Sequence, residues 1–282
     1  MVIQSTDTQP NDAAENNSKN SIPRLRQLIS QGRLTRFWPL LIIFIRFPLI
    51  MLGNLIVYGA IITFTDRANP WEYALMWGNV HTSLIADAIT IALVVWLIRR
   101  EGLSLADLIN WRPGQLWRES LNGLGLTVIL YLTLFIGGMA GAFIAFGSDA
   151  FAFDSSAFAD LTRADLPPLW YYLWSFIILP ITVAVAEELA YRGYAQPRLE
   201  ALIGGKWTAV FIVAFGFGIQ HIAFSLTDWQ SALARFIGTF IAGLVFGIIY
   251  LRQRRLFLLI IAHWLVDVIG LGLFPMMFYL SL

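Results

Sequence analysis

The chain has no cysteine and few charged residues. The absence of cysteine excludes a disulfide framework, a catalytic thiolate and a cysteine-ligated metal site. Only 13% of the 282 residues are charged, whereas soluble domains carry about a quarter. The net charge is +1, so the strongly basic surface of a nucleic-acid-binding protein is missing and no nucleic-acid partner is expected. Histidine is also scarce, with His81, His221 and His263 as its three members.

Hydrophobic residues, by contrast, make up 58% of the chain. A helix needs about 20 mostly apolar residues to cross a bilayer. Seven segments meet this condition: 38–64, 74–98, 121–146, 169–194, 207–224, 233–251 and 256–274. The alternating pattern of a β-barrel is absent. We therefore predict an all-α, polytopic transmembrane helical bundle of about seven spanning helices, with membrane lipids as its surroundings.

Lys and Arg alternate between the connections of these segments. They are frequent before residue 37 and in 99–120, 191–206 and 252–255, and scarce in 65–73, 147–168 and 225–232. The positive-inside rule then predicts a cytoplasmic N-terminus and a multi-pass protein of the cell membrane, of the bacterial inner-membrane type. Residues 1–22 are polar and are expected to be disordered, without the features of a signal peptide.

Ionisable residues inside spanning segments are functional candidates. Glu188 and Arg192 are four residues apart, so they share a helix face and can form an ion pair. Glu187 lies about 100° away from that face and is left free of the pair. Two further pairs have the same spacing of four: Phe217 with His221, and His263 with Asp267.

Two kinds of chemistry follow if these faces converge. In the first, a free glutamate and one histidine activate a water molecule, and a second histidine with a neighbouring polar side chain stabilises the oxyanion. In the second, Glu187, His221 and His263 bind a zinc ion, although the HExxH signature is absent. Both alternatives hydrolyse an amide bond, and the residues alone do not choose between them.

Other polar residues have simpler interpretations. We expect His81 to form an interhelical hydrogen bond and Asp87 to be a hydrogen-bonded structural residue. Arg46, beside Pro48, is interpreted as a snorkelling arginine at a kink. The small-residue pairs Gly137 with Gly141 and Gly243 with Gly247 predict close helix packing within the bundle.

Three motifs give the sequence a family resemblance. Residues 187–192 (EELAYR) match EExxxR, residues 217–221 (FGIQH) match FxxxH, and residues 263–267 (HWLVD) match HxxxN or HxxxD. In this order and on predicted spans, they resemble the CPBP family of CAAX proteases and bacteriocin-processing enzymes, also called the Abi family. The resemblance divides the chain into a partly disordered cytoplasmic tail (1–36), N-terminal transmembrane helices (37–167), a protease core (168–270) and a C-terminal tail (271–282).

The resemblance implies an intramembrane endopeptidase acting on a peptide or membrane protein. Glu187 and His221 would activate water, while His263 and Asp267 would form the oxyanion hole, supported by Glu188, Arg192 and Phe217. Family members are also labelled metalloproteases, so zinc stays an alternative cofactor. An ionised Asp only accepts hydrogen bonds, so Asp267 in place of Asn would act protonated, orient His263 or help to bind a metal.

Two structural expectations and two rival functions remain. We expect the site to open toward the cytoplasmic half of the membrane. His221 lies about two turns too deep if its helix starts at Trp207, so a protruding or tilted helix, or a start near residue 213, is required. The rivals are a non-enzymatic bacteriocin-immunity or scaffold protein and a proton-coupled transporter that uses His81, Asp87 and the glutamates.

Overall fold

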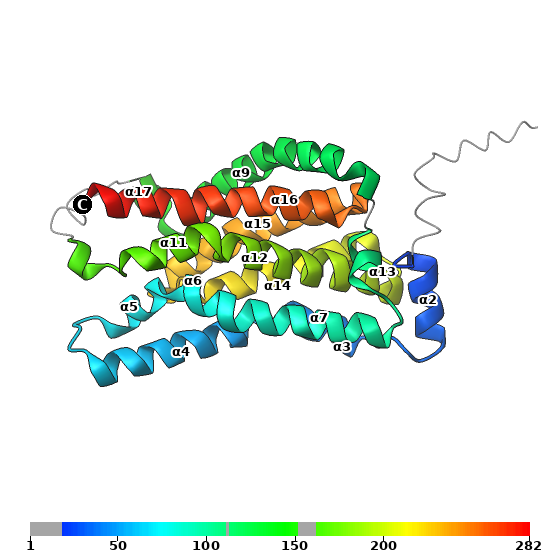
Figure 1. Ribbon diagram of the computed structural model, residues 1–282, viewed down its shortest axis with the longest axis horizontal. Helices are drawn as coiled ribbons and strands as arrows, with labels where there is room; N and C mark the ends of the chain where they lie inside the picture. The colour runs from blue at the N-terminus through cyan, green and yellow to red at the C-terminus, as the bar shows by residue number, and fades with distance from the viewer. Residues whose placement is uncertain (1–18, 111–112, 152–161) are drawn as a thin grey trace, which may run out of the picture.

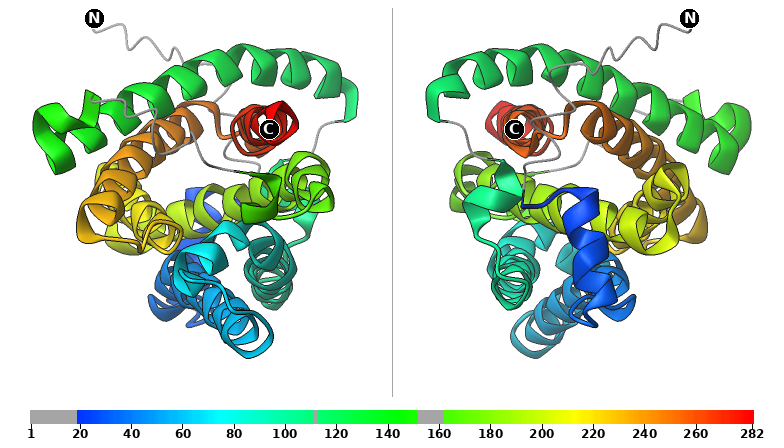
Figure 2. Two further views of the ribbon diagram at one scale, coloured as in Figure 1. Left: turned by 90° about the vertical axis from the view of Figure 1, so that its left-hand side faces the viewer. Right: turned by 90° about the vertical axis from the view of Figure 1, so that its right-hand side faces the viewer.

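The computed structural model describes residues 19–110, 113–151 and 162–282, and these residues form helices and no strand. The predicted all-α helical bundle is thereby confirmed. Most of the tail expected to be disordered lies outside the described residues. Most of the long helices run along the molecule (Figure 1), whereas the helix Leu116–Phe146 crosses them obliquely, as the end-on views show (Figure 2).

The first half of the chain supplies three long helical segments and the short elements between them. The elements are α2 (Ile22–Ser30), α3 (Phe37–Phe44), α4 (Arg46–Phe64), α5 (Pro70–Met76), α6 (Gly78–His81), the π-helical η1 (Thr82–Asp87), α7 (Ala88–Arg100), α8 (Leu105–Ile109), the 3₁₀ turn η2 (Pro113–Gln115), α9 (Leu116–Phe146) and the 3₁₀ turn η3 (Gly147–Phe151). Helix α8 begins at a capping box, because Ser104 and Asp107 each bond the other's backbone.

The second half forms the rest of the bundle. Its elements are the 3₁₀ turn η4 (Arg163–Asp165), α11 (Leu169–Ile177), α12 (Leu179–Glu187), the π-helical η5 (Glu188–Ala195), α13 (Gln196–Ile203), α14 (Lys206–Ile222), α15 (Trp229–Gln253), α16 (Leu256–Asp267), the π-helical η6 (Val268–Leu273) and α17 (Phe274–Ser281). Helix α11 meets α12 at a 40° bend, and Pro180 lies in the first turn after it.

All seven predicted segments are helical, but they differ in length. Five continuous helices are long and apolar enough to cross a membrane: Phe37–Phe64, Gly78–Arg100, Leu116–Ala150, Trp229–Gln253 and Leu256–Ser281. The bent pair Leu169–Ile177 and Leu179–Ile203 makes a sixth span if it counts as one, and α14 is shorter. Several apolar helices thus indicate a multi-pass membrane protein, while the number of seven and the cytoplasmic N-terminus stay predictions.

One helix near the N-terminus was not expected from the polar composition. Helix α2 buries Leu25 and Leu28 against Ala201 of α13. Its remaining face is charged and exposed, so it lies on the end of the bundle beside α13 (Figure 1). Part of the predicted tail is therefore a docked amphipathic helix. At the other terminus, α17 extends the last long helix.

The depth of His221 follows from helices that continue past the predicted edges. Helix α13 ends at Ile203, not near Ala195, so Glu187 lies about 24 Å from its end. His221 lies about 22 Å from the start of α14 at Lys206. The start near residue 213 is thus wrong. A Cβ on Gly193 would meet Leu256 at 2.9 Å, so α16 begins level with Gly193, and the α13–α14 turn protrudes beyond it.

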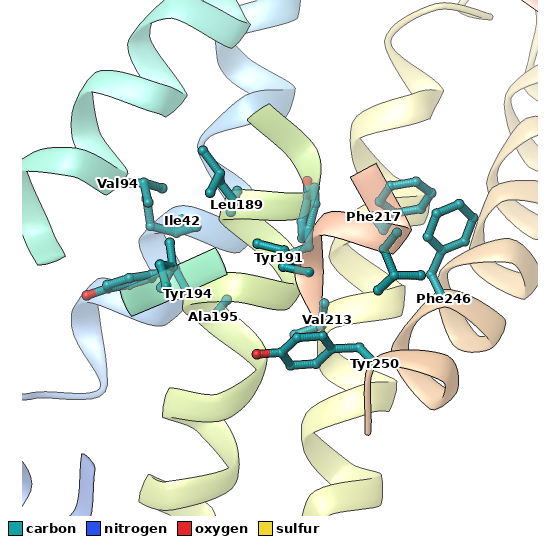
Figure 3. Close-up of a cluster of buried hydrophobic side chains, with 14 of the residues drawn as sticks. Ile42, Val94, Leu189, Tyr191, Tyr194, Ala195, Val213, Phe217, Phe246 and Tyr250 are labelled. Carbon is teal, nitrogen blue, oxygen red and sulfur yellow. The ribbon is translucent and has the colours of Figure 1, made fainter. Parts of the chain in front are cut away.

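The core lies where the motif-bearing helices cross. Tyr191, Phe217 and Phe246 are buried there, and their rings pack at centroid distances of 5.3 Å (Tyr191–Phe217) and 6.4 Å (Phe217–Phe246) (Figure 3). Leu189 and Ile42 belong to the same cluster. The apolar core therefore holds α3, η5, α14 and α15 at fixed distances around the polar residues described below.

The small-residue pairs lie at close helix contacts, as predicted. Gly137 and Gly141 of α9 face the backbone of α15, where a Cβ on Gly141 would come within 2.3 Å of the Ala234 carbonyl oxygen. Gly243 and Gly247 of α15 face Ala214 and Val210 of α14. Helix α15 is thus packed between two neighbours through glycine.

Gly141→Ala is expected to destabilise the protein, because the added methyl group meets backbone that cannot rotate away. Overpacking of this kind costs about 1–3 kcal/mol. Gly138→Ala on the same helix is the matched control, since its Cβ would meet nothing within 4 Å. Alanine there favours the helix by about 0.5–1 kcal/mol. Thermal unfolding in detergent should show a lower melting temperature for Gly141→Ala alone, and equal values would contradict the packing.

Candidate active site

Glu187 is held by one oxygen and free at the other. It is 3% exposed at the end of α12. Its Oε1 accepts hydrogen bonds from Arg46 Nη2 at 3.1 Å and from Gln220 Nε2 at 2.9 Å. Its Oε2 is buried without a hydrogen-bond partner among the described residues. The carboxylate is therefore fixed through Oε1, and Oε2 remains available to accept a hydrogen bond or a proton.

The residue that fixes Glu187 comes from the first long helix. Arg46 is fully buried, and its guanidinium contacts Asp87 at 2.8 Å, Glu187 at 3.1 Å and Gln220 Oε1 at 2.5 Å. The interpretation of Arg46 as a snorkelling side chain is therefore wrong. The side chain instead points into the bundle, where the carboxylates of Asp87 and Glu187 neutralise its charge.

Glu188 makes the ion pair predicted from its spacing. Its Oε1 accepts from Arg192 Nη1 at 3.1 Å, and both side chains are completely buried. The Arg192 guanidinium lies beside the stacked rings of Phe217 and Phe246, 4.6 and 4.7 Å from their centroids. The same Glu188 oxygen lies 2.9 Å from His263 Nδ1. Glu188 thus connects the EExxxR motif to the helix that carries His263.

His263 has a carboxylate beside each ring nitrogen. Nδ1 donates to Glu188, while Nε2 lies 3.8 Å from Glu187 Oε2 and 3.5 Å from Asp267 Oδ2. Because Nδ1 carries a proton for Glu188, the ring orientation is fixed. Asp267 lies one turn away from His263 on α16, where it is placed to orient the histidine.

His221 reaches the same place from α14. Its Nδ1 donates to the Phe217 carbonyl oxygen at 2.7 Å, which leaves Nε2 with its lone pair. The Phe217 ring packs near both histidines, with its centroid 4.7 Å from that of His221 and 6.5 Å from that of His263. The structure thus brings together Glu187, His221 and His263 from three helices.

Each of the three π-helical segments begins or ends at this carboxylate cluster. The segment η1 ends at Asp87, η5 begins at Glu188, and η6 begins directly after Asp267. A π-helical turn adds a residue to the helix and so changes the direction in which the following side chains point. Such turns are rare and occur frequently at functional sites.

A cavity of about 510 Å³ adjoins the cluster. Glu187, His221, His263 and Asp267 all line it. Apolar and aromatic side chains form most of the rest of the wall, among them Tyr131, Leu134, Phe135, Tyr171, Leu179, Val183, Phe224 and Val266. A largely apolar cavity with a few converging polar groups is the usual form of a ligand site.

The residues proposed as zinc ligands do not form a metal group. Within the described ranges, no set of three His, Asp or Glu side chains is arranged so that it could hold a metal ion. The donor chemistry agrees with this, because both ring nitrogens of His263 face carboxylates and Nδ1 of His221 bonds to the Phe217 carbonyl oxygen. We therefore derive no step through zinc.

The remaining polar residues of the second long segment are structural. His81 Nε2 lies 2.8 Å from Asn54 Oδ1 on α4, which confirms the interhelical hydrogen bond. Asp87 is buried and paired with Arg46. Arg46 and Gln220 are the polar partners of Glu187 that the motifs did not reveal. A charged residue within an apolar run was the available signal for Arg46.

Comparison with known proteins found one match. Residues 168–269 match the family model described as type II CAAX prenyl endopeptidase Rce1-like. Searches of curated proteins and of solved structures found no match. The matched region carries all three motifs, so the resemblance to the CAAX proteases is confirmed, whereas α2 to α9 lie outside it.

Proposed function

We propose that this chain, whose residues 168–269 match the Rce1-like CAAX endopeptidases, is an intramembrane endopeptidase that hydrolyses a peptide bond of a membrane-associated peptide or protein. One observation carries the proposal beyond the family match. The free oxygen of Glu187 lies beside His263 at the wall of a cavity, while the other oxygen is fixed by Arg46 and Gln220.

In the proposed reaction, Glu187 Oε2 takes a proton from a water molecule held near His221 Nε2. The hydroxide adds to the scissile carbonyl carbon. His263, acting as an imidazolium beside the carboxylates of Glu188 and Asp267, keeps its Nδ1 proton on Glu188 and stabilises the oxyanion with its Nε2 proton. Collapse of the intermediate breaks the carbon–nitrogen bond, and Glu187 returns its proton to the leaving amine. Asp267 orients His263, and Arg46 keeps Glu187 in place.

A comparison of membrane proteomes tests this function. Cells that produce the wild-type protein should accumulate new peptide termini, and cells that produce Glu187→Gln should not. Identical termini in both strains, together with a less stable variant, would instead favour the immunity or scaffold role, in which the motifs only hold the bundle together.

Chelation gives a second test of the mechanism. Because no step passes through a metal, incubation of the purified protein with EDTA or 1,10-phenanthroline should leave its cleavage rate unchanged. Loss of activity that is restored by added zinc would contradict this mechanism and return zinc to the site.

A further inference from the structure

The catalytic residues lie at the inner end of the cavity, which extends from them in one direction. On α16 and η6 the lining residues run from His263 through Asp267 to Leu271, toward the C-terminus. On α11 and α12 they run from Glu187 back through Val183 to Tyr171, toward the start of α11. Both sets lead to the same end of the bundle, where α11 begins and α17 ends (Figure 1).

The other walls show the same direction. On α9 the lining residues Tyr131 to Phe135 lie in the half that leads to residue 146. On α15 the lining residue Thr239 lies in the first half of the helix, and before α7 the wall runs from Thr82 back to Leu75. All these helix ends lie at the end of the molecule that carries the C-terminus (Figure 2, left).

The two ends of the bundle differ in charge. The end reached by the cavity carries the basic residues Arg67, Arg163 and Arg235 and the acidic residues Asp66, Glu72, Asp149, Asp165 and Asp228. The opposite end carries the acidic residues Glu101, Asp107, Glu119 and Glu200 and a larger set of basic residues: Lys19, Arg24, Arg26, Arg33, Arg36, Arg99, Arg100, Arg118, Arg198, Lys206, Arg252, Arg254 and Arg255. Lys and Arg are concentrated on the cytoplasmic side of membrane proteins. Under this rule the cavity leads to the non-cytoplasmic end of the bundle, whereas the sequence predicts a site that opens toward the cytoplasmic half.

We propose that the substrate enters from the non-cytoplasmic side, as an apolar peptide segment presented at the outer half of the membrane. The inference rests on the proposed peptidase function for the identity of the occupant. The route itself rests on the lining residues and the charges. Apolar lining residues such as Leu134, Phe135 and Leu179 suit an apolar segment, and the blind end at Glu187 places its scissile bond beside the base.

Single cysteines can test the route, because the native chain has none. Met76→Cys lies at the outer part of the wall, and Thr239→Cys lies deeper. Arg118→Cys, exposed at the opposite end, is the control. A membrane-impermeant maleimide should label Met76→Cys and Thr239→Cys in intact cells. It should label Arg118→Cys only in inside-out vesicles.

Three results would overturn the proposal: labelling of Thr239→Cys only from the cytoplasmic side, no labelling of it from either side, or labelling of Arg118→Cys in intact cells. These labelling experiments require no catalysis, so their outcome does not depend on whether the protein is a peptidase. If the unlabelled Thr239→Cys protein cleaves its substrate, maleimide added from outside should block the cleavage. Cleavage that continues unchanged after labelling would contradict the proposed substrate route. If neither the wild-type protein nor the variants cleave any substrate, the proposed peptidase function is wrong. The labelling then still shows from which side of the membrane the cavity is accessible.

Discussion

Glu187→Gln should reduce the cleavage rate of the purified protein by about 10²–10⁴-fold, the usual contribution of a general base. The amide oxygen of the new side chain can still accept from Arg46 and Gln220, and Arg46 keeps its pair with Asp87. The variant should therefore remain folded with a melting temperature near that of the wild type. Turnover measured on a substrate identified from the cells, alongside thermal unfolding, checks both statements.

The neighbouring Glu188→Gln is the matched control. Arg192 and Glu188 are fully buried, so neutralising Glu188 leaves a guanidinium without its carboxylate at a cost of about 3–5 kcal/mol. Glu188→Gln should thus lower stability strongly, and Glu187→Gln should lower the rate strongly. Full activity in Glu187→Gln would refute the proposed mechanism, and equal stability losses in the two variants would mean that the two glutamates share one structural role.

The helices were predictable because hydrophobic runs are a direct consequence of the bilayer. The residues at which the helices begin and end were harder to predict. The predicted span 169–194 stops where the segment becomes polar, with Arg192, Gln196 and Arg198. In the fold these side chains are buried in polar contacts, including that of Gln196 with the Gly247 carbonyl oxygen. Hydropathy cannot distinguish such a paired polar residue from one that faces water.

Within the site, the four-residue spacings predicted the local pairs. Glu188 with Arg192 and His263 with Asp267 depend only on helix periodicity, and both are found. Arg46 could not be placed in this way, because its partners Asp87 and Glu187 lie 41 and 141 positions away in the chain (87 − 46 and 187 − 46). Pairing between distant helices is decided by packing, such as the contact of Gly216 with Ile43 of α3.

Arg46→Met should be the most destabilising of the substitutions at this cluster. It leaves Asp87 and Glu187 buried with no cation between them, and removing one partner from a buried ion pair costs about 3–5 kcal/mol. Activity should fall as well, because Glu187 loses one of the two donors that hold its Oε1. Thermal unfolding and cleavage rates of the purified variant measure the two effects.

Two further variants separate charge from shape. Arg46→Lys retains a cation but lacks the planar fork that reaches both carboxylates at once, so its stability should fall between those of the wild type and Arg46→Met. In Arg46→Met with Asp87→Asn, one of the stranded carboxylates is gone, so the double variant should be more stable than Arg46→Met alone. Additive losses from the two substitutions would show that Arg46 and Asp87 do not act as a pair. A coupled result would mean that Arg46 and Asp87, both outside the family motifs, act as one buried ion pair beside Glu187.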